Sequence, residues 1–342
     1  MTTVTTIGID LAKQVFHVHG VDRRGKTVLR RKIGRSDILT FFANLPRCLV
    51  GIEAGRASHH WARELSRLGH DVRLMPPQYV KPYVKTNKND ALDAEAICEA
   101  VRRPTMRFVP IKTVDQQAIL SVHRAREQLV RTRTAQANQL RGLLGEFGIL
   151  VRSGIHCVIR GAENVIGDDH SQLPALLKPL LRELVEHVRL VDAQIARLER
   201  QIVTWHRDNE ASRRLAAIPG VGPLTASAMV ASVPDPNAFR TGRQLAAWLG
   251  LVPRQHSSGS RERLLGISKR GNIYLRTLLI HGARSIATHT RSCPHHVRSW
   301  LEQLRGRRHA NVAVVALANK VARIIWAVMV RNEPYVSTLA RA

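Results

Sequence analysis

Four acidic side chains have the types and positions that a divalent-cation site requires. Asp10 lies within an apolar run with the composition of a strand, and Glu53 lies near the end of a second such run. Asp90 and Asp93 lie three residues apart in a helical pattern. A separation of three residues places two side chains on the same face of a helix. An ionised carboxylate in an apolar strand is costly to bury unless a cation or hydrogen-bond donors compensate it. The four side chains could therefore converge on one spot.

The chemistry of such a site would be phosphoryl transfer. Mg²⁺ takes oxygen ligands, and two such ions about 4 Å apart can stabilise both the attacking and the leaving oxygen of a phosphodiester. Each acid alone also has a structural explanation: Asp90 as a helix N-cap, Asp93 as a first-turn partner of the helix dipole, and Glu53 as a solvent-facing residue at a strand end. The combination of all four with a strongly basic chain favours a site that cuts nucleic acid.

The charge balance indicates the partner. The 342 residues include 53 Lys and Arg against 26 Asp and Glu, a formal net charge of +27. This excess would repel itself in a compact fold, so a polyanion, above all nucleic acid, is the simplest partner. A hydrophobic fraction of 44% over this length excludes a disordered basic tail and predicts two or three domains.

Cysteine usage and the polarity of two segments indicate the compartment. The four cysteines lie far apart with no CxxC pair, which argues against a zinc ribbon and against a secreted disulfide scaffold. The first residues lack the basic region of a signal peptide, and the apolar stretch 312–330 is interrupted by Asn319, Lys320 and Arg323. We expect a soluble, cytoplasmic protein with no membrane span.

The excess charge is unevenly distributed along the chain. Residues 1–110 hold 19 basic and 10 acidic residues (+9), residues 111–210 hold 14 and 12 (+2), and residues 211–342 hold 20 and 4 (+16). Contact with a polyanion should therefore concentrate in the first and last parts. The middle part is expected to be a spacer or an assembly element.

The first part has the pattern of a mixed sheet covered by helices. Its β-branched and apolar runs predict strands at 2–11, 14–22, 26–34, 48–53 and 71–75. Helical patterns separate or follow them at 36–45, 56–68 and 90–101. The order β-β-β-α-β-α-β-α fits an α/β domain with helices against the faces of a mixed sheet.

The middle part is predicted to be helical. Its clearest feature is an apolar seam with alternating spacings of three and four residues, formed by Val188, Val191, Ile195, Leu198, Ile202 and Trp205. Together with a second amphipathic stretch at 113–145, this heptad pattern predicts an antiparallel helical hairpin or an intermolecular coiled coil. An ordinary helix packed on its own domain fits equally well. Residues 152–171, which contain three glycines and Asp168-Asp169, are expected to form a loop.

The last part opens with a helix-hairpin-helix pattern. Residues 215–226 contain a helix, the turn Ile218-Pro219-Gly220-Val221-Gly222 and the start of a second helix. Gly220 and Gly222 permit a close backbone approach, and the second helix offers its first N–H groups to a phosphate. DNA binding is therefore expected here, and a purely structural helical hairpin is the alternative.

A segment rich in serine and basic residues follows. Ser257 and Ser258 lie among cations that could hold phosphates or stabilise a developing oxyanion beside a serine nucleophile. These cations are Arg254, Arg261, Arg263, Lys269 and Arg270. Composition alone also fits a flexible polar loop. No histidine and aspartate spacing identifies a serine hydrolase, so acyl transfer is not expected.

Taken together, these motifs resemble the DEDD transposases of bacterial insertion sequences, the one-ten family, which is related to a pilin-gene invertase and is understood as a family of RNA-guided recombinases. The resemblance covers nearly the whole chain. It rests on Gly8-Ile9-Asp10 with Ala12-Lys13, Ile52-Glu53-Ala54, Asp90-Ala91-Leu92-Asp93-Ala94, Ile218-Pro219-Gly220-Val221-Gly222, Gly250-Leu251-Val252-Pro253-Arg254, Ser258-Gly259 and Ser268-Lys269-Arg270-Gly271.

The resemblance implies three domains. Residues 1–110 would form an RNase H-like domain of the Holliday-junction-resolvase type, residues 111–210 a helical coiled-coil linker, and residues 211–342 a mainly helical transposase domain with the helix-hairpin-helix. In the first domain the resemblance implies four acids that bind Mg²⁺ and are also the catalytic residues. They are Asp10, Glu53, Asp90 and Asp93. Nucleic-acid contacts would fall on Gly220, Gly222, Arg254, Arg261, Lys269 and Arg270.

The resemblance also implies a nucleophile and partners. The catalytic serine falls on Ser258, with Ser257 left open by one residue. The chain would act as a homo-oligomer, from dimer to tetramer, in which the acids of one protomer meet the serine of another. A bridge RNA encoded by the element would pair with the double-stranded donor and target DNA.

Three functions remain in competition at this point. The leading one is a transposase or recombinase that cuts and rejoins DNA through a phosphoserine link for the excision and integration of an insertion sequence. The second is a junction-resolving nuclease that uses the four acids alone, and a covalent protein–DNA adduct separates the two. The third is a non-catalytic architectural DNA-binding protein, which has no use for converging acids. Sugar kinases of the actin-like fold also open with Gly-Ile-Asp, but no second phosphate loop of their type follows.

Overall fold

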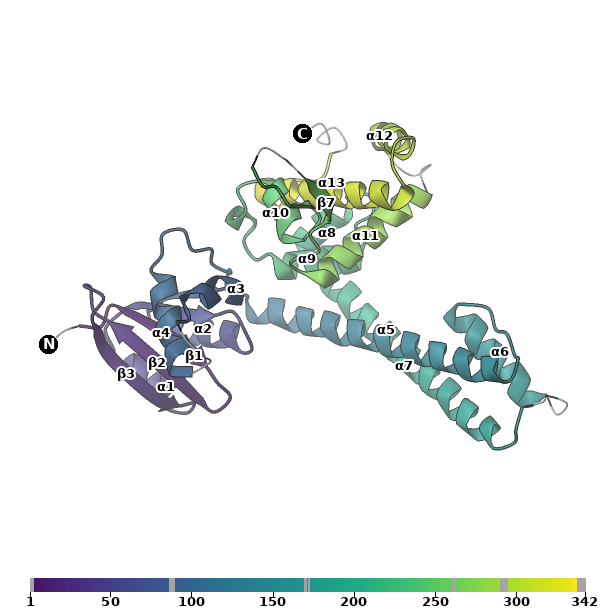
Figure 1. The fold of residues 1–342 in the computed structure, drawn as a ribbon, viewed down its shortest axis with the longest axis horizontal. Helices are drawn as coiled ribbons and strands as arrows, with labels where there is room; N and C mark the ends of the chain where they lie inside the picture. Colours follow the sequence, from purple (N-terminus) through teal and green to yellow (C-terminus); the bar gives the residue numbers. More distant parts are fainter. Residues whose placement is uncertain are drawn as a thin grey trace. The chain divides into compact units, whose positions relative to one another are not determined.

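The protein packs as two units, each with its own buried apolar clusters. A computed structural model describes residues 3–85, 90–168, 171, 173–259, 263–289 and 295–336. Unit 1 comprises Met1–Gln116 and Val233–Ala238, and unit 2 comprises Gln117–Ser232 and Phe239–Ala342 (Figure 1). Unit 2 thus contains residues of both the predicted middle and last parts, and the three-part division stays a prediction.

Unit 1 is built on a five-stranded mixed sheet. Its strands are β1 Thr6–Leu11, β2 Val15–Val21, β3 Thr27–Gly34, β4 Leu49–Glu53 and β5 Asp71–Met75. The strand order is β3-β2-β1-β4-β5, with β1 antiparallel to β2, β2 antiparallel to β3, and β1, β4 and β5 mutually parallel. The helices are α1 Ile38–Ala43, α2 Ser58–Arg67, α3 Pro77–Val80, η1 Lys81–Tyr83 and α4 Asp90–Val101. The predicted order of strands and helices is confirmed, and the short α3 and η1 are additions to it.

The two faces of the sheet carry different helices. Successive residues of a strand point to opposite faces. Ile7 and Ile9 therefore share one face, where they belong to a buried cluster that also includes Phe42 of α1 and Trp61 of α2. The alternate residues of β1, beginning with Gly8, face α4. Helix α4 is thus the element that covers the face on which Asp10 lies.

Two glycines in adjacent strands form the seat of α4. Gly8 of β1 pairs with Gly51 of β4 in the parallel register. A Cβ atom at Gly8 would lie 2.3 Å from the backbone O of Ala94 and the backbone N of Cys98, and one at Gly51 would lie 2.8 Å from Cβ of Val101. At Gly8 the α4 backbone therefore rests directly on the strand backbone, and at Gly51 the Val101 side chain does, separations that only glycine permits.

Unit 2 is mainly helical. Its long helices, α5 Val114–Glu146 (whose first turn belongs to unit 1) and α7 Leu177–Asp208, are accompanied by α6 Ile155–Gly167, α8 Glu210–Ala216, α9 Pro223–Ser232, α10 Gly242–Trp248, α11 Ile273–Thr288, α12 His295–Arg305 and α13 Ala310–Arg331. A two-stranded antiparallel sheet in this unit consists of β6 Pro253–Gln255 and β7 Leu264–Ile267, and a short 3₁₀ turn, η2 Pro236–Ala238, belongs to unit 1.

The heptad seam packs within the chain. Val188 belongs to a buried cluster with Leu140 and Leu144 of α5, and Ile202 belongs to another with Ile119 and Leu120 of α5. Ion pairs join Arg126 to Glu199 and Arg133 to Asp192, so residue numbers rise along one helix as they fall along the other. The helices are therefore antiparallel, as the hairpin alternative predicted, and the seam is already covered by α5.

The predicted loop at 152–171 is wrong, because a helix, α6, occupies most of it. Gly154 is the N-cap of α6 with a φ of 112°, and Gly167 is its last residue, so two of the three glycines mark its ends. The third, Gly161, lies inside the helix, where a Cβ atom would lie 2.7 Å from Cγ1 of Val151. Glycine is used here for close packing rather than as a helix breaker, and the sequence pattern does not distinguish the two uses.

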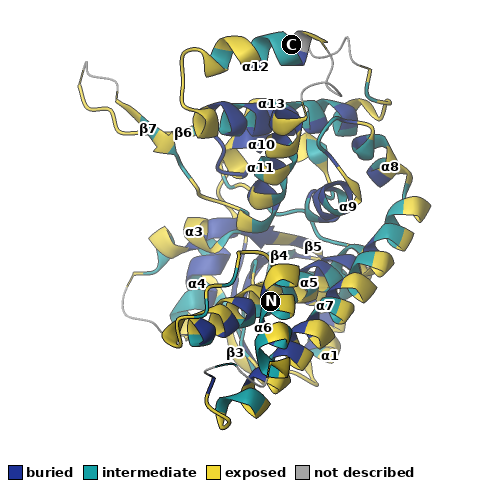
Figure 2. Ribbon diagram, turned by 90° about the vertical axis from the view of Figure 1, so that its right-hand side faces the viewer, coloured by how far each residue is buried: buried dark blue, intermediate teal, exposed yellow. Residues whose placement is uncertain are grey.

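Helix α13 covers the stretch that the sequence analysis considered too polar to span a membrane. By length and composition alone it is long and apolar enough to do so. It nevertheless packs against α10 and α11 within unit 2. Its polar residues have local roles, since Asn319 Nδ2 donates to Leu251 O at 3.2 Å and Lys320 lies over the Trp300 ring. Figure 2 shows that α13 carries buried and intermediate residues along its length.

A buried polar chain connects α5 with α9 and α11. Ser227 donates its hydroxyl proton to Pro223 O at 2.6 Å, so it accepts from His123 Nε2 at 3.0 Å. This fixes the tautomer and leaves His123 Nδ1 to accept from the Tyr274 hydroxyl at 2.9 Å. Burial lowers the pKa of His123 to about 4, with the Arg126 cation as the smaller cause in the same direction. His123 is therefore neutral at physiological pH.

We expect Gly8→Ala to lower the free energy of unfolding of unit 1 by about 3 kcal/mol, because the added methyl group meets backbone atoms of α4 that cannot move independently. Thermal unfolding of the full chain measures this. Gly142→Ala is the matched control, since Gly142 lies in α5 with nothing within 4 Å of its Cβ position and should gain about 0.5–1 kcal/mol. Equal stability of the two variants would contradict the close packing of α4 on Gly8.

We expect His123 to make unit 2 less stable in acid. The folded-state pKa of His123 is depressed below its ordinary value, so the unfolded chain binds its proton first as pH falls. Stability should be full above pH 6.5 and decline by about 3 kcal/mol between pH 6.5 and 4. His123→Gln, which does not titrate, should show a shallower decline than the wild type in urea unfolding at each pH. Identical pH profiles would overturn the assignment.

Candidate active site

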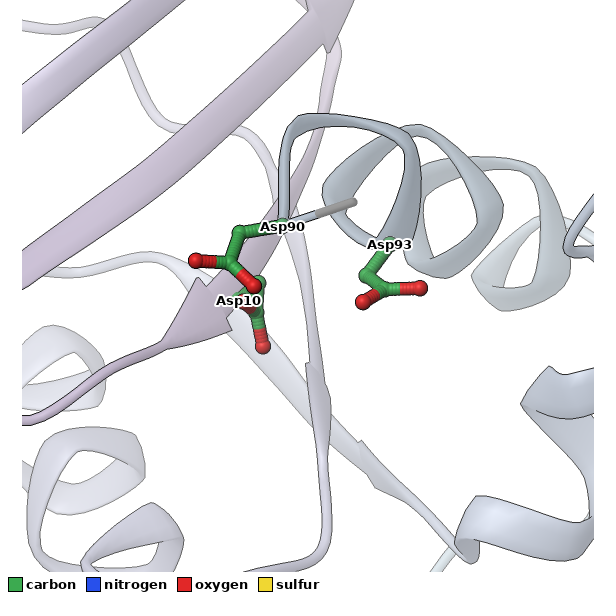
Figure 3. Close-up of side chains that lie close together, drawn as sticks. All are labelled: Asp10, Asp90 and Asp93. Atoms are coloured by element: carbon green, nitrogen blue, oxygen red, sulfur yellow. The ribbon is translucent and has the colours of Figure 1, made fainter. Parts of the chain in front are cut away.

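Three of the four predicted acids come together in unit 1. Asp10 lies in β1, and Asp90 and Asp93 lie in the first turn of α4 (Figure 3). One carboxylate oxygen of each lies within 4.8 Å of those of the other two. Asp10 and Asp93 are half-buried, and Asp90 is exposed. Three carboxylates at this separation are a suitable ligand set for a hard divalent cation.

Glu53 lies beside this cluster at the end of β4. Its carboxylate does not fall within the same 4.8 Å group. Burial raises the pKa of Glu53 above its ordinary value, and the negative charges of Asp10 and Asp93 raise it further. Glu53 therefore faces the same space as the other acids, and an added cation would relieve the repulsion among them. Its role as a ligand stays a prediction.

The same short pattern places both strand acids. Gly8 and Gly51 are each followed two residues later by an acid, Asp10 in β1 and Glu53 in β4. Since side chains alternate along a strand, each acid lies on the same face as its glycine, one step beyond the seat of α4. The first turn of α4 lies over that position and contributes the remaining two acids. The seat of α4 therefore positions the cluster of Asp10, Asp90 and Asp93, with Glu53 beside it.

The sequence analysis missed a histidine at this site. His17 of β2 pairs with Asp10 in the antiparallel register, and its Nε2 lies 3.9 Å from Oδ2 of Asp90. Its side chain is 21% exposed. The signal that could have found it is the register of the β2 hairpin, which places His17 beside Asp10 on the same face of the sheet.

The two candidate nucleophilic serines lie in unit 2, at an exposed hairpin. Ser257 and Ser258 follow β6 and are both exposed, and Gly259 has a positive φ of 60°. The β6 and β7 strands extend away from the helices of unit 2 (Figure 2). Among the predicted cations, Arg254 lies in β6 and is exposed, whereas Arg261 lies outside the described residues.

The base of this hairpin is tightly held. Gly250 and Gly271 have positive φ values of 74° and 86°, and a Cβ atom at either would lie about 2 Å from a backbone oxygen of the opposing segment. Arg276, which is 7% exposed, donates through Nη1 to Leu249 O at 2.9 Å and to Arg270 O at 3.2 Å. The sequence analysis missed Arg276, because nothing in the composition distinguishes a buried arginine from an exposed one.

The two other cations predicted to contact nucleic acid lie at the same base. Lys269 and Arg270 are exposed, and Lys269 has a positive φ of 54°, which is uncommon for a residue with a side chain. Lys269 N donates to Gly250 O, so the bond to this segment holds the conformation. Their role in nucleic-acid binding stays a prediction.

The predicted helix-hairpin-helix segment consists of α8, a turn and α9, which begins at Pro223. Gly220 has a φ of 77°, and a Cβ atom there would lie 2.9 Å from Gly282 O in α11. Gly222 is exposed, with nothing within 4 Å of its Cβ position. Gly220 thus has a packing role, and Gly222 is the glycine of this turn that remains accessible to a phosphate.

Two family models for transposases match this chain. A family model for the DEDD type of IS110 transposase, described as "Transposase", matches residues 7–149, which include all four acids. A second, described as "Transposase IS116/IS110/IS902 family", matches residues 212–298, which include the β6–β7 hairpin.

Full-length relatives carry transposase names. A probable family 20 transposase of Pseudomonas aeruginosa is 54% identical over 97% of this chain and 98% of its own length. The transposase for the insertion sequence element IS1328 of Yersinia enterocolitica is 43% identical over 96% of this chain and 97% of its own length. The transposase for the insertion sequence element IS1111A of Coxiella burnetii is 43% identical over 98% of this chain and 92% of its own length. The chain therefore belongs to the IS110/IS116 family of transposases, enzymes that cut and rejoin DNA.

Proposed function

We propose that this transposase holds Mg²⁺ with the four acids of unit 1 and uses Ser258 as the nucleophile that cuts and rejoins DNA. The acids are Asp10, Glu53, Asp90 and Asp93. The observation that carries the proposal is the convergence of three carboxylates within 4.8 Å in a chain with a net charge of +27. Like charges at this separation in a half-buried site are costly unless a cation shares them.

The donor set fits Mg²⁺ by its chemistry. All the ligands would be carboxylate oxygens, which this hard cation prefers. Burial raises the pKa of Glu53, and the negative charges of Asp10 and Asp93 add to the rise. When bound, Mg²⁺ would supply positive charge to the oxygens of the reacting phosphodiester. The protein's part is to hold the acids in a fixed arrangement, which the close packing of α4 on Gly8 supports.

The serine step conserves the energy of the phosphodiester bond. The Ser258 Oγ would form a bond to phosphorus as the bond from phosphorus to one sugar oxygen breaks, and the serine proton would pass to the leaving oxygen. Attack by a sugar hydroxyl of a second DNA end would reverse the step and release the serine. A serine hydroxyl is a weak nucleophile, and Arg254 in the same hairpin supports charge on the phosphate. Ser257 is the alternative nucleophile.

Several further properties belong to the same proposal. We infer that unit 1 is an RNase H-like domain, which its five-stranded order supports, and that the α8–α9 turn is a DNA-binding helix-hairpin-helix. The partners would be double-stranded donor and target DNA and a bridge RNA, and the protein would act in the cytoplasm, off the membrane. It would assemble as a dimer to tetramer in which acids and serine come from different protomers, and surfaces other than the covered Val188–Trp205 seam would hold the protomers together.

The second candidate is a junction-resolving nuclease that uses the four acids alone. The acid cluster favours it, because four carboxylates with their cation are sufficient for hydrolysis. The exposed serines distinguish the two candidates, since a nuclease needs neither. The experiment that separates them is therefore the search for a serine-linked DNA intermediate.

We expect Mg²⁺ at a hundredfold excess over its Kd to stabilise the folded wild type by about 2.7 kcal/mol. Its melting temperature should therefore rise. Asp10→Asn should melt higher than the wild type without Mg²⁺, because one of the crowded charges is gone, and should lose the response to Mg²⁺. Differential scanning calorimetry of the full chain measures both effects.

The matched control for this measurement is Asp71→Asn, which removes an exposed acid of unit 1 that pairs with Arg73. It should keep the Mg²⁺ response of the wild type. A wild type whose melting temperature ignores Mg²⁺, or an Asp10→Asn protein that responds in full, would remove the basis of the metal site.

We expect Ser258→Ala to abolish both strand exchange and the covalent protein–DNA adduct. The full-length protein is incubated with DNA that carries the ends of its own element, denatured, and the adduct is located by proteolysis and mass spectrometry. Ser257→Ala should retain the adduct, because its hydroxyl is the neighbouring one. An adduct lost only in Ser257→Ala moves the nucleophile by one residue, and DNA cutting by the wild type without any adduct establishes the nuclease.

A further inference from the structure

A basic groove lies beside the acid cluster on the α4 face of the unit 1 sheet. Its floor is β2 and its walls are the edge strand β3 and the first turns of α4. The residues that line it are His17, Val18, His19, Arg30, Arg31, Lys32, Ala91, Leu92, Ala94 and Glu95. Small alanines on α4 leave the groove open, and the proposed metal chemistry uses none of these side chains.

Two cross-strand rows lead from this groove to the acids. In the antiparallel registers Lys32 of β3 pairs with His17 of β2, which pairs with Asp10 of β1. The neighbouring row runs from Arg30 through His19 to Gly8, the seat of α4. Residues in one row share a face of the sheet. The cations of β3 therefore lie on the same face as the acids and two strands away, which is about 10 Å.

One acid organises the cations without neutralising them. Glu95 of α4 pairs with Arg30 at 3.2 Å and with Lys85 at 3.4 Å, so two cations share one carboxylate. Lys32 forms no ion pair with any described residue. Because a guanidinium has five N–H donors, Arg30 keeps several for a second anion after its contact with Glu95.

We propose that this groove binds the sugar-phosphate backbone of the DNA strand that is being cut, a short distance from the reacting phosphodiester. Arg30 and Lys32 contact the phosphates, and Glu95 holds Arg30 in position. Phosphates on one strand advance about 3.4 Å per nucleotide along the helix axis, so the groove reaches backbone roughly three nucleotides from the acids. The proposal rests on the acid cluster being the site of cutting and adds the surface that aligns the strand there.

The first test removes the two charges. Arg30→Gln with Lys32→Gln, in a full-length Asp10→Asn protein that cannot cut, should bind a short DNA duplex roughly tenfold more weakly at physiological salt and lower the salt slope by about 1.8. The control, Arg23→Gln with Arg24→Gln, removes the same charge from the exposed β2–β3 turn of the same unit. It should change the affinity no more than twofold. Equal losses in the two variants overturn the proposal.

The second test locates the strand. Ala91 is exposed and lines the groove from α4, so Ala91→Cys offers a thiol there for a photocrosslinking reagent. In a full-length chain that also carries Cys157→Ser and Cys293→Ser, the reagent should crosslink to the cut strand within a few nucleotides of the cutting site. The same reagent attached through Arg24→Cys should not. Crosslinks confined to RNA, or to the uncut strand, overturn the proposal.

These readouts separate the groove from the proposed chemistry, because both are binding measurements. If the acids do not cut DNA, the affinity difference between the two double variants still tests the groove. If they cut and the affinity difference is missing, the groove fails and the acid cluster stands. Loss of fold is checked by the melting temperature, which exposed Arg→Gln and Lys→Gln changes should leave within a few degrees.

Discussion

The contact between the backbone of α4 and the glycine pair of the sheet is the constraint on which the site depends. Gly8 and Gly51 admit the helix so closely that Ala94 O and Cys98 N occupy the space of a side chain. At Gly8 no side chain lies between the backbones of helix and strand, which limits how far α4 can slide. A slip of one helical turn would move Asp90 and Asp93 by about 5.4 Å, more than the separation that now brings them to Asp10.

Electrostatics explains why so rigid a support is needed. Burial raises the pKa of Glu53, and the negative charges of Asp10 and Asp93 raise it further, so an ionised Glu53 is less favourable here than in water. The sheet holds the acids in place, and β3 carries its cations two strands away rather than beside them. The proposed metal ligands and the proposed phosphate-binding cations thereby lie apart on one face, an arrangement that suits a phosphodiester substrate.

Much of unit 1 was predictable from the sequence, because its strands and helices have clear periods and its acids stand out against apolar runs. The groove was not, since Arg30, Lys32 and His17 meet only through the register of two hairpin pairings. Helix α6 was missed because Gly161 packs against Val151, and packing partners are not written in the local pattern. The seam at Val188 and Ile202 was recognised as apolar, but an amphipathic helix does not specify which helix covers it.

The β6–β7 hairpin of unit 2 holds its candidate functional residues differently from the acid site of unit 1. Its base is fixed by Gly250, Gly271 and the two hydrogen bonds of Arg276, whereas Ser257 and Ser258 beyond it are exposed. A side chain held by a rigid support keeps its orientation, and its exposure leaves it accessible to a large substrate. Within the described residues no carboxylate pairs with either serine. If Ser258 is the nucleophile, as we propose, its activation must therefore come from groups that reach it when DNA is bound, and the proposed site supplies them from the acids of unit 1.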